Sequence, residues 1–170
     1  MKLFPGKIDI IAAELAHSLA AEEAIEATDI KEVEMDIAAV FKEYIRVDRE
    51  LTDQAKDLCE KRSLPYSAFP KIKRQLADKL MFRMGEDALD YIMEQLLGCF
   101  MHSQFVEEIF AEDHEIKVIM RPIIRKHTEI EDNIDEETRQ RIKNLKEGTA
   151  EWDIEYQRAK AQVMKRRQLT

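Results

Sequence analysis

The densest group of side chains that could bind a metal lies between residues 99 and 114. It combines one thiol, two imidazoles and four carboxylates: Cys99, His102, Glu107, Glu108, Glu112, Asp113 and His114. A dinuclear metal site in a helical bundle uses Glu-x-x-His pairs, because that spacing projects both ligands inward one helical turn apart. None of these glutamates has a histidine three residues later. We therefore interpret the group as an acidic surface with one histidine at the edge of the core, and we predict no metal ion and no cofactor.

Sequence motifs for nucleophilic catalysis and nucleotide binding are absent. The chain contains no Gly-x-Ser-x-Gly turn, no P-loop and no Gly-x-Gly-x-x-Gly fingerprint, and those chemistries depend on such backbone turns. Neighbouring carboxylates occur, but 35 acidic residues in 170 produce such pairs without any acid–base function. We predict no catalytic residues and favour a non-enzymatic role, with a metal-dependent helical enzyme as a third hypothesis.

Two short basic runs, at residues 71–75 and 165–167, are candidates for contact with an acidic partner. They contribute six cations: Lys71, Lys73, Arg74, Lys165, Arg166 and Arg167. Lysine and arginine bind the phosphates of nucleic acids, and two aromatic residues, Tyr66 and Phe69, lie near the first run. Platforms that stack single-stranded bases are usually built on sheets, however, and no sheet is predicted here. We interpret the runs as solvated helix faces or as contact sites for an acidic partner.

The only tryptophan of the chain is followed one helical turn later by a tyrosine. Trp152 and Tyr156 are four residues apart, so they share one face of a helix. The favoured interpretation is that this face packs into the core. Because Trp and Tyr are enriched among interface hot spots, anchoring of a partner is the alternative.

The charge of the chain is unevenly distributed. The formal net charge is −8, but residues 61–83 contain seven Lys or Arg against one acid, and residues 139–170 contain nine against four. An acidic protein is disfavoured for non-specific binding to nucleic acid or to an anionic membrane. The basic zones are therefore expected to meet acidic protein surfaces, including acidic zones of a second copy.

A low content of glycine and proline, four of each, predicts helices rather than the many turns of a β-protein. Apolar residues at three- and four-residue steps, with a capping box at Asp29 and Glu32, predict seven helices: 7–27, 30–62, 67–80, 86–111, 114–130, 135–145 and 150–167. The helix at 86–111 is apolar nearly all round and is expected at the centre of the core. Pro122 is expected to kink or split its helix, and Asp135 to cap the next one.

The second half of the sequence resembles a degraded copy of the first. At an offset of 81 residues the apolar pattern of residues 8–15 matches residues 89–96, and at an offset of 83 that of residues 37–51 matches residues 120–134. We predict an all-α helical bundle of two similar multi-helix units, residues 1–83 and 84–170, packed together. Units of this length gain stability by burying apolar faces against each other. Duplication is the hypothesis that explains the match.

The compartment is inferred from the cysteines and from the N-terminal residues. Cys59 and Cys99 are not in a metal-ligand spacing, which is typical of thiols in a reducing compartment. Asp9 and Glu14 interrupt what would be the apolar region of a signal peptide, and no stretch approaches the ~20 apolar residues that span a bilayer. We expect a cytoplasmic protein.

Four segments resemble a known bacterial family. They are MKLFPGKI at 1–8, EVEMDIAAVFKEYIR at 32–46, VEEIFAED at 106–113 and RIKNLKEGTAEWDIEY at 141–156. These segments are similar to the family catalogued as domain of unknown function 507, over essentially the whole chain. The resemblance implies a bacterial, cytoplasmic and helical protein and carries no active site across. Shorter members resemble only one half, which fits the duplication hypothesis.

The leading functional hypothesis is a non-enzymatic protein–protein interaction or adaptor protein, with self-association included. It is based on the amphipathic helix faces and the segregated charges. The alternative is a nucleic-acid- or ribosome-associated factor that uses the basic segments 61–83 and 158–167. Steep salt dependence of binding would support that alternative.

Overall fold

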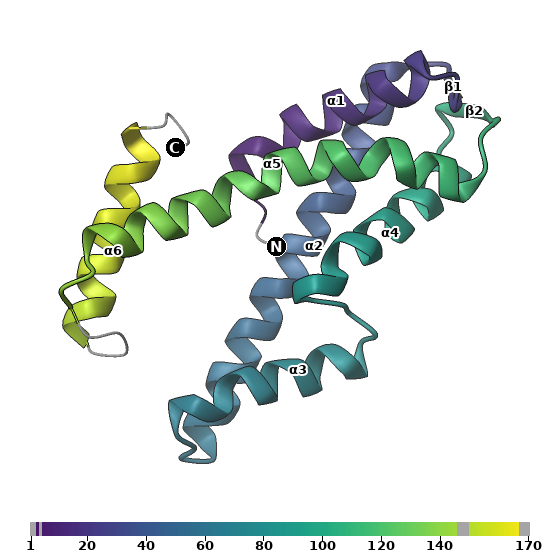
Figure 1. The fold of residues 1–170 in the computed structure, drawn as a ribbon. Coiled ribbons are helices and arrows are strands. Elements are labelled where there is room, and N and C mark those ends of the chain that lie inside the picture. Colours follow the sequence, from purple (N-terminus) through teal and green to yellow (C-terminus); the bar gives the residue numbers. More distant parts are fainter. Residues whose placement is uncertain (1–2, 4, 146–149, 167–170) are drawn as a thin grey trace. The chain divides into compact units, whose positions relative to one another are not determined.

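The computed structural model describes residues 3, 5–145 and 150–166 (Figure 1). Among these residues are six α-helices and one two-stranded sheet, so the predicted all-α helical fold is confirmed. Contacts divide the chain into two compact units: unit 1 spans residues 3–124 and unit 2 spans residues 125–170. Helix α5 (Asp113–Arg141) contributes to both.

Unit 1 is built around its longest helix. Its elements, in chain order, are a 3-10 turn (Pro5–Lys7), α1 (Ile8–Ala21), β1 (Ile25–Ala27), α2 (Ile30–Lys61), a 3-10 turn (Tyr66–Ala68), α3 (Phe69–Lys79), a 3-10 turn (Gly85–Asp87), α4 (Ala88–His102), β2 (Val106–Ile109) and the first part of α5. Helix α2 contacts α1, α3 and α4. Unit 2 consists of the rest of α5 and α6 (Ala150–Arg166).

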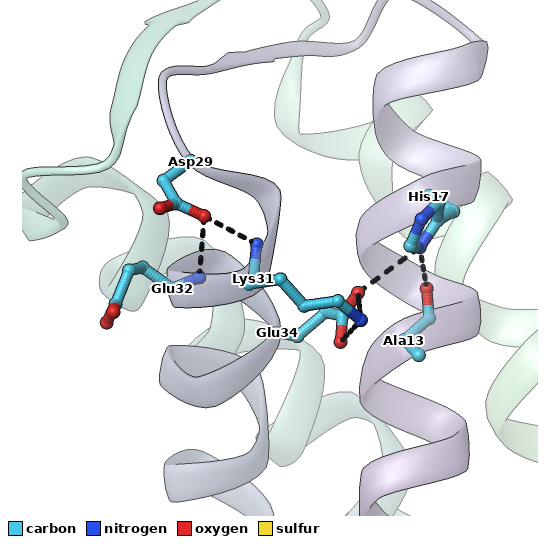
Figure 2. Close-up of polar contacts among 6 residues, drawn as sticks. All are labelled: Ala13, His17, Asp29, Lys31, Glu32 and Glu34. Carbon is cyan, nitrogen blue, oxygen red and sulfur yellow. Dashed lines mark hydrogen bonds and ion pairs between the residues drawn. The ribbon is translucent and has the colours of Figure 1, made fainter.

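Helix α2 begins where the sequence predicts it, at a capping aspartate. The Asp29 carboxylate accepts hydrogen bonds from the backbone N–H groups of Lys31 (2.9 Å) and Glu32 (3.4 Å). These bonds satisfy two donors that have no partner inside the helix. Figure 2 shows the Glu32 carboxylate turned away from Asp29, so only the aspartate half of the predicted capping box forms.

The core of unit 1 is made by the apolar faces of α1, α2 and α4. The predicted stripe of α2 is buried at Val33, Ile37, Phe41, Tyr44 and Leu51. Helix α4 buries seven of its residues: Ala88, Leu89, Ile92, Met93, Leu96, Leu97 and Phe100. A helix that is apolar around most of its circumference packs on several sides. Helix α2, however, is the one that contacts α1, α3 and α4, so α4 contributes to this core without being its predicted centre.

Three aromatic rings hold the connection between α3 and α4 against α2. The ring centroid of Tyr44 lies 4.7 Å from that of Phe82, and Phe82 lies 5.4 Å from Tyr91. The Tyr44 hydroxyl donates to the Arg83 carbonyl over 3.2 Å. Burial, followed by the nearby charge of Asp48, raises the pKa of Tyr44. The hydroxyl therefore remains a donor throughout the physiological pH range.

The predictions that helices extend to residue 27 and to residue 111 are wrong, because each region ends in a strand. Helix α1 ends at Ala21, and two residues later the left-handed φ of 53° at Glu23 lets Ala24 N–H reach the Leu19 carbonyl over 2.9 Å. This is the usual Schellman geometry of a helix end. Strands β1 and β2 then pair antiparallel, with Ile25 opposite Ile109. The absence of a sheet was also predicted wrongly.

The same order of elements occurs twice along the chain. A 3-10 turn, a helix, a strand, a long helix and a shorter helix begin at residues 5, 8, 25, 30 and 69, and again at 85, 88, 106, 113 and 150. The first series also has a 3-10 turn, Tyr66–Ala68, that has no counterpart among the described residues of the second. The two strands of the repeated order pair with each other. This order is compatible with duplication of residues 1–83 and 84–170, which stays a hypothesis.

Helix α5 is longer than the sequence predicts. It continues through Pro122 to Arg141, so Pro122 does not split it and Asp135 lies inside it rather than at a helix start. Proline removes one hydrogen bond and crowds the preceding turn, but Met120 and Ile124 on either side of it are buried in the core of unit 1. Packing therefore outweighs the local preference of proline.

Candidate interaction site

The predicted aromatic face lies in unit 2, at the start of α6. Trp152 and Tyr156 are partly exposed and begin a stripe that continues through Ala159 and Val163, both buried. The stripe has steps of four, three and four residues, so all four side chains lie on one side of the helix. The core of unit 2 thus buries the end of the stripe and leaves its aromatic start within reach of solvent.

The two aromatic rings form a stacked pair flanked by two cations. The ring centroids of Trp152 and Tyr156 are 4.8 Å apart and the rings are inclined by 17°. The Arg139 guanidinium lies 5.5 Å from the Trp152 centroid, and Lys160 Nζ lies 5.9 Å from the Tyr156 centroid. A cation over an aromatic face is attracted by the negative charge of the π-system. We call these four side chains the aromatic–cation cluster.

One carboxylate of α5 holds the cluster in place. Asp135 accepts a hydrogen bond from the Tyr156 hydroxyl and another, of 2.7 Å, from Arg139 Nε. Burial on its own would raise the pKa of Asp135, but the hydrogen bonds from Tyr156 and Arg139, with the positive charges of Arg139 and Lys160, lower it below its usual value. The ionised Asp135 carboxylate thus holds the Tyr156 ring through its hydroxyl. It also holds the Arg139 guanidinium that lies over the Trp152 ring.

The lowered pKa of Asp135 predicts an acid-sensitive contribution to the stability of unit 2. An acid whose pKa is lower in the folded state stabilises that state above its unfolded pKa of about 3.9 and loses the contribution as the pH falls through the folded value. We expect Asp135→Asn to lower the unfolding midpoint at pH 7 and the difference from wild type to shrink as the pH falls below about 4. The measurement is urea unfolding followed by Trp152 fluorescence.

The control for this prediction is Asp153→Asn, which removes an exposed carboxylate from α6, the other helix of unit 2. Its unfolding midpoint should follow wild type at every pH. A difference between Asp135→Asn and wild type that is as large at pH 2 as at pH 7 would contradict the prediction, because the lost interaction would then not depend on the charge of the carboxyl group.

The basic residues predicted at the end of α6 differ in their surroundings. Arg166 Nη2 contacts Glu137 Oε1 at 2.6 Å, so its charge is paired within unit 2. Lys165 is exposed and forms no ion pair with any residue that the structure describes. Arg167 lies outside the described residues. One of the two described cations of this run is therefore available to a partner.

The basic run of α3, in unit 1, is divided in the same way. Lys71 and Arg74 are exposed. Lys73 Nζ contacts Asp48 Oδ1 at 2.7 Å, and its side chain is only 17% exposed. Lys73 thus fastens α3 to α2 rather than facing a partner, and the sequence gives no signal of this because Asp48 is 25 residues away.

The group of candidate metal ligands does not converge. Cys99 and His102 lie in α4, Glu107 and Glu108 lie in β2, and within the described part of the chain no three His, Cys, Asp or Glu side chains are arranged to hold a metal ion. Burial, with the charge of Asp36, raises the pKa of the Cys99 thiol. The nearby Ser103 Oγ donates to Asp36 Oδ2 over 2.6 Å, which links the end of α4 to α2.

One Glu-x-x-His pair occurs outside that group, at Glu14 and His17 in α1. Figure 2 shows His17 next to Ala13 and Glu34: its Nδ1 lies 2.8 Å from the Ala13 carbonyl and 3.5 Å from Glu34 Oε1. Glu34 is shared with Lys31, whose Nζ lies 2.8 Å away. The surroundings of His17 are those of a surface ion pair.

A hollow of about 380 Å³ lies between the start of α1 and the middle of α2. Two cations of its lining are paired: Lys42 contacts Asp9 at 3.4 Å, and Arg46 contacts Glu43 at 2.6 Å and also Glu50. The hollow is lined by Pro5, Ile8, Lys42, Ile45, Arg46, Arg49, Glu50 and Asp53. Carboxylates in this lining would oppose an anionic ligand, and the aromatic–cation cluster remains the stronger candidate for a contact site.

Comparison with known proteins identifies one family and no activity. The model of the family described as "Protein of unknown function (DUF507)" matches residues 1–169, which confirms the resemblance of the four sequence segments. No curated protein matches the chain. Within the described residues, no helix is both long enough and apolar enough to cross a membrane.

Proposed function

From the premise that the chain belongs to the DUF507 family of proteins of unknown function, we propose that it is a non-enzymatic interaction protein. It binds a protein partner through the aromatic–cation cluster of unit 2. The setting we propose is the bacterial cytoplasm, in keeping with the family resemblance and the two free cysteines. No bound cofactor is part of this proposal.

The observation that carries the proposal is that Trp152 contacts both Tyr156 and Arg139. Tryptophan, tyrosine and arginine are the residue types most enriched among interface hot spots. Here all three are in contact, with both rings partly exposed. Stacking and the bond to Asp135 hold the rings in one orientation, so little rotamer entropy would be lost when a partner covers them.

Three of the basic residues are paired with carboxylates, which lowers the number of cations available to phosphates and favours a protein partner over nucleic acid. Five others stay unpaired among the described residues: Lys61, Arg62, Lys71, Arg74 and Lys79. Binding to phosphates requires cations that can neutralise them, yet Lys73 contacts Asp48, Arg166 contacts Glu137 and Arg158 contacts Glu155 at 2.8 Å. Each of these carboxylates would repel a phosphate. Nucleic acid remains the alternative partner, and the experiment below separates the two.

The test compares partner recovery with wild type, Trp152→Ala and Gln162→Ala, the last being an exposed position on the same helix. Full-length tagged proteins are crosslinked in native cells, purified with and without nuclease treatment, and quantified by mass spectrometry. Truncation of a hot-spot residue costs about 2 kcal/mol or more, so we expect recovery of the partner to fall at least about tenfold for Trp152→Ala. Gln162→Ala should recover the wild-type amount.

Two outcomes would contradict the proposal. One is equal recovery of every protein with wild type and with Trp152→Ala, provided that circular dichroism shows both to be folded. The other is loss of the recovered proteins after nuclease treatment, which would favour the nucleic-acid alternative. Trp152→Phe, which keeps an aromatic ring over Tyr156, should restore part of the binding and so separate contact from folding.

A further inference from the structure

We propose that unit 1 binds a second copy of the chain head to tail, the basic end of one copy against the acidic end of the next. The basic end is defined by Lys61, Arg62, Lys71, Arg74 and Lys79. The acidic end is defined by Glu22, Glu23, Glu26, Glu107, Glu108 and Asp113. This association uses residues of unit 1 only, and it goes beyond the partner proposed for the aromatic–cation cluster.

The basic end lies at the end of α2, with Lys61 and Arg62, and along α3, with Lys71, Arg74 and Lys79. All five of its cations are exposed, and none forms an ion pair with a residue that the structure describes. Apolar side chains are exposed beside them: Leu64, Leu80 at 59% and Met81 at 82%. A surface that combines unpaired cations with exposed apolar groups suits an acidic protein surface with apolar residues of its own.

The acidic end lies around the two strands. Residues 22–29 and 103–113 contain eight Asp or Glu and no Lys or Arg. All six carboxylates that define this end are exposed, and none is paired with a cation in the described parts of the chain. Glu26 stands directly opposite Glu108 in the strand pair, where like charges destabilise. Exposed Met101, at 72%, and Phe110, at 57%, supply the apolar groups.

Within one molecule the basic end and the acidic end lie too far apart to form ion pairs with each other. β1 ends just before α2 begins, and the basic end starts where α2 ends. The 32 residues of α2 make a helix ~48 Å long at 1.5 Å per residue, and Figure 1 shows the strands and α3 at opposite ends of it. Charges this far apart are screened, because the Debye length at physiological salt is about 8 Å.

Every molecule carries one basic end and one acidic end, so the two surfaces are present at equal concentration and can meet between two copies. Each acidic end would then gain cations that the described residues of unit 1 do not place beside it, and the repulsion between Glu26 and Glu108 would be relieved. A contact between two different surfaces of identical molecules leaves one of each surface open at the ends of the assembly, so it forms open chains unless the geometry closes into a ring. The assembly should therefore grow with concentration and shrink with salt.

The experiment is sedimentation velocity of the full chain at a series of concentrations, in about 20 mM and about 500 mM salt. The basic-end variant carries Lys71→Glu and Arg74→Glu, which removes most of the positive charge of that end. The acidic-end variant carries Glu107→Lys and Glu108→Lys, which makes that end less acidic. We expect wild type to associate at low salt only. Each variant alone should associate at least about tenfold more weakly than wild type, and a 1:1 mixture of the two should regain association.

The mixture makes the test independent of damage to the fold, because two misfolded variants would not restore each other. Wild type that stays monomeric at low salt would overturn the proposal, and so would variants that associate as well as wild type, or a mixture that gains nothing. Growth of the wild-type mass only after addition of RNA would also overturn it. Trp152→Ala should associate normally here, so failure of this proposal and failure of the proposed function are distinguishable.

Discussion

Replacing Phe41 with alanine is expected to lower the free energy of unfolding by about 3–5 kcal/mol, the usual cost of removing a buried phenylalanine. Phe41 has 0% of its surface exposed and belongs to the core that α1, α2 and α4 share. Loss of the ring removes its transfer free energy and leaves a cavity that the surrounding helices fill only in part. The measurement is urea unfolding followed by far-ultraviolet circular dichroism.

The control for Phe41→Ala is Met35→Ala on the same helix. Met35 is 61% exposed, so its truncation should change stability by no more than about 0.5 kcal/mol. Hydrogen exchange of α1, α2 and α4 locates the loss, and all three should exchange faster in Phe41→Ala. An equal and small effect of the two substitutions would show that α2 does not carry the core.

Local periodicity was sufficient to predict the helices of unit 1 but not their ends. The α2 stripe and the Asp29 cap are both visible in sequence because they depend on residues within one or two turns. The end of α1 depends on Glu23 in a left-handed conformation, and glycine, the usual signal for that conformation, is not there. The strands depend on pairing between residues about 80 positions apart, which no local pattern records.

The residues of the candidate site divide in the same way: some are predicted by local spacing, and others depend on a distant part of the chain. The shared face of Trp152 and Tyr156 follows from their spacing, and the structure has them stacked. Arg139, which belongs to the cluster, and Asp135, which holds it in place, come from α5, and the sequence analysis predicted Asp135 at the start of a separate helix. Predicting the cluster would have required the length of α5, and that length is set by burial of Met120 and Ile124 despite Pro122.

The charge pattern is the feature whose meaning the structure changes most. Composition shows the basic zone of residues 61–83 and the acidic segments around the strands, but composition alone cannot tell whether such zones neutralise each other. The length of α2 separates them, and the ion-pair pattern leaves five cations of the basic zone and six carboxylates of the acidic segments unpaired within the described residues. The surface charges of unit 1 are therefore separated into two ends of opposite sign that are complementary to each other.

Replacing Ile134 with alanine is expected to unfold unit 2 while unit 1 stays folded. The core of unit 2 contains few side chains, with Ile134, Thr138 and Val163 each 0% exposed. Truncation of a buried isoleucine costs about 2–5 kcal/mol, and a unit as short as residues 125–170 has little stability to lose. Amide protection in α6, measured by hydrogen exchange with mass spectrometry, should fall at least about tenfold, because local opening reports the stability of each unit.

Helices α1, α2 and α4 should keep their wild-type exchange rates in Ile134→Ala, since their residues belong to unit 1. The control is Ile154→Ala, which removes an exposed isoleucine from α6 and replaces it with a better helix former; it should leave protection in α6 unchanged or slightly raised. If Ile134→Ala accelerated exchange equally in α1 and in α6, the chain would unfold as one cooperative body. The aromatic–cation cluster would then owe its order to the stability of the whole protein rather than to unit 2.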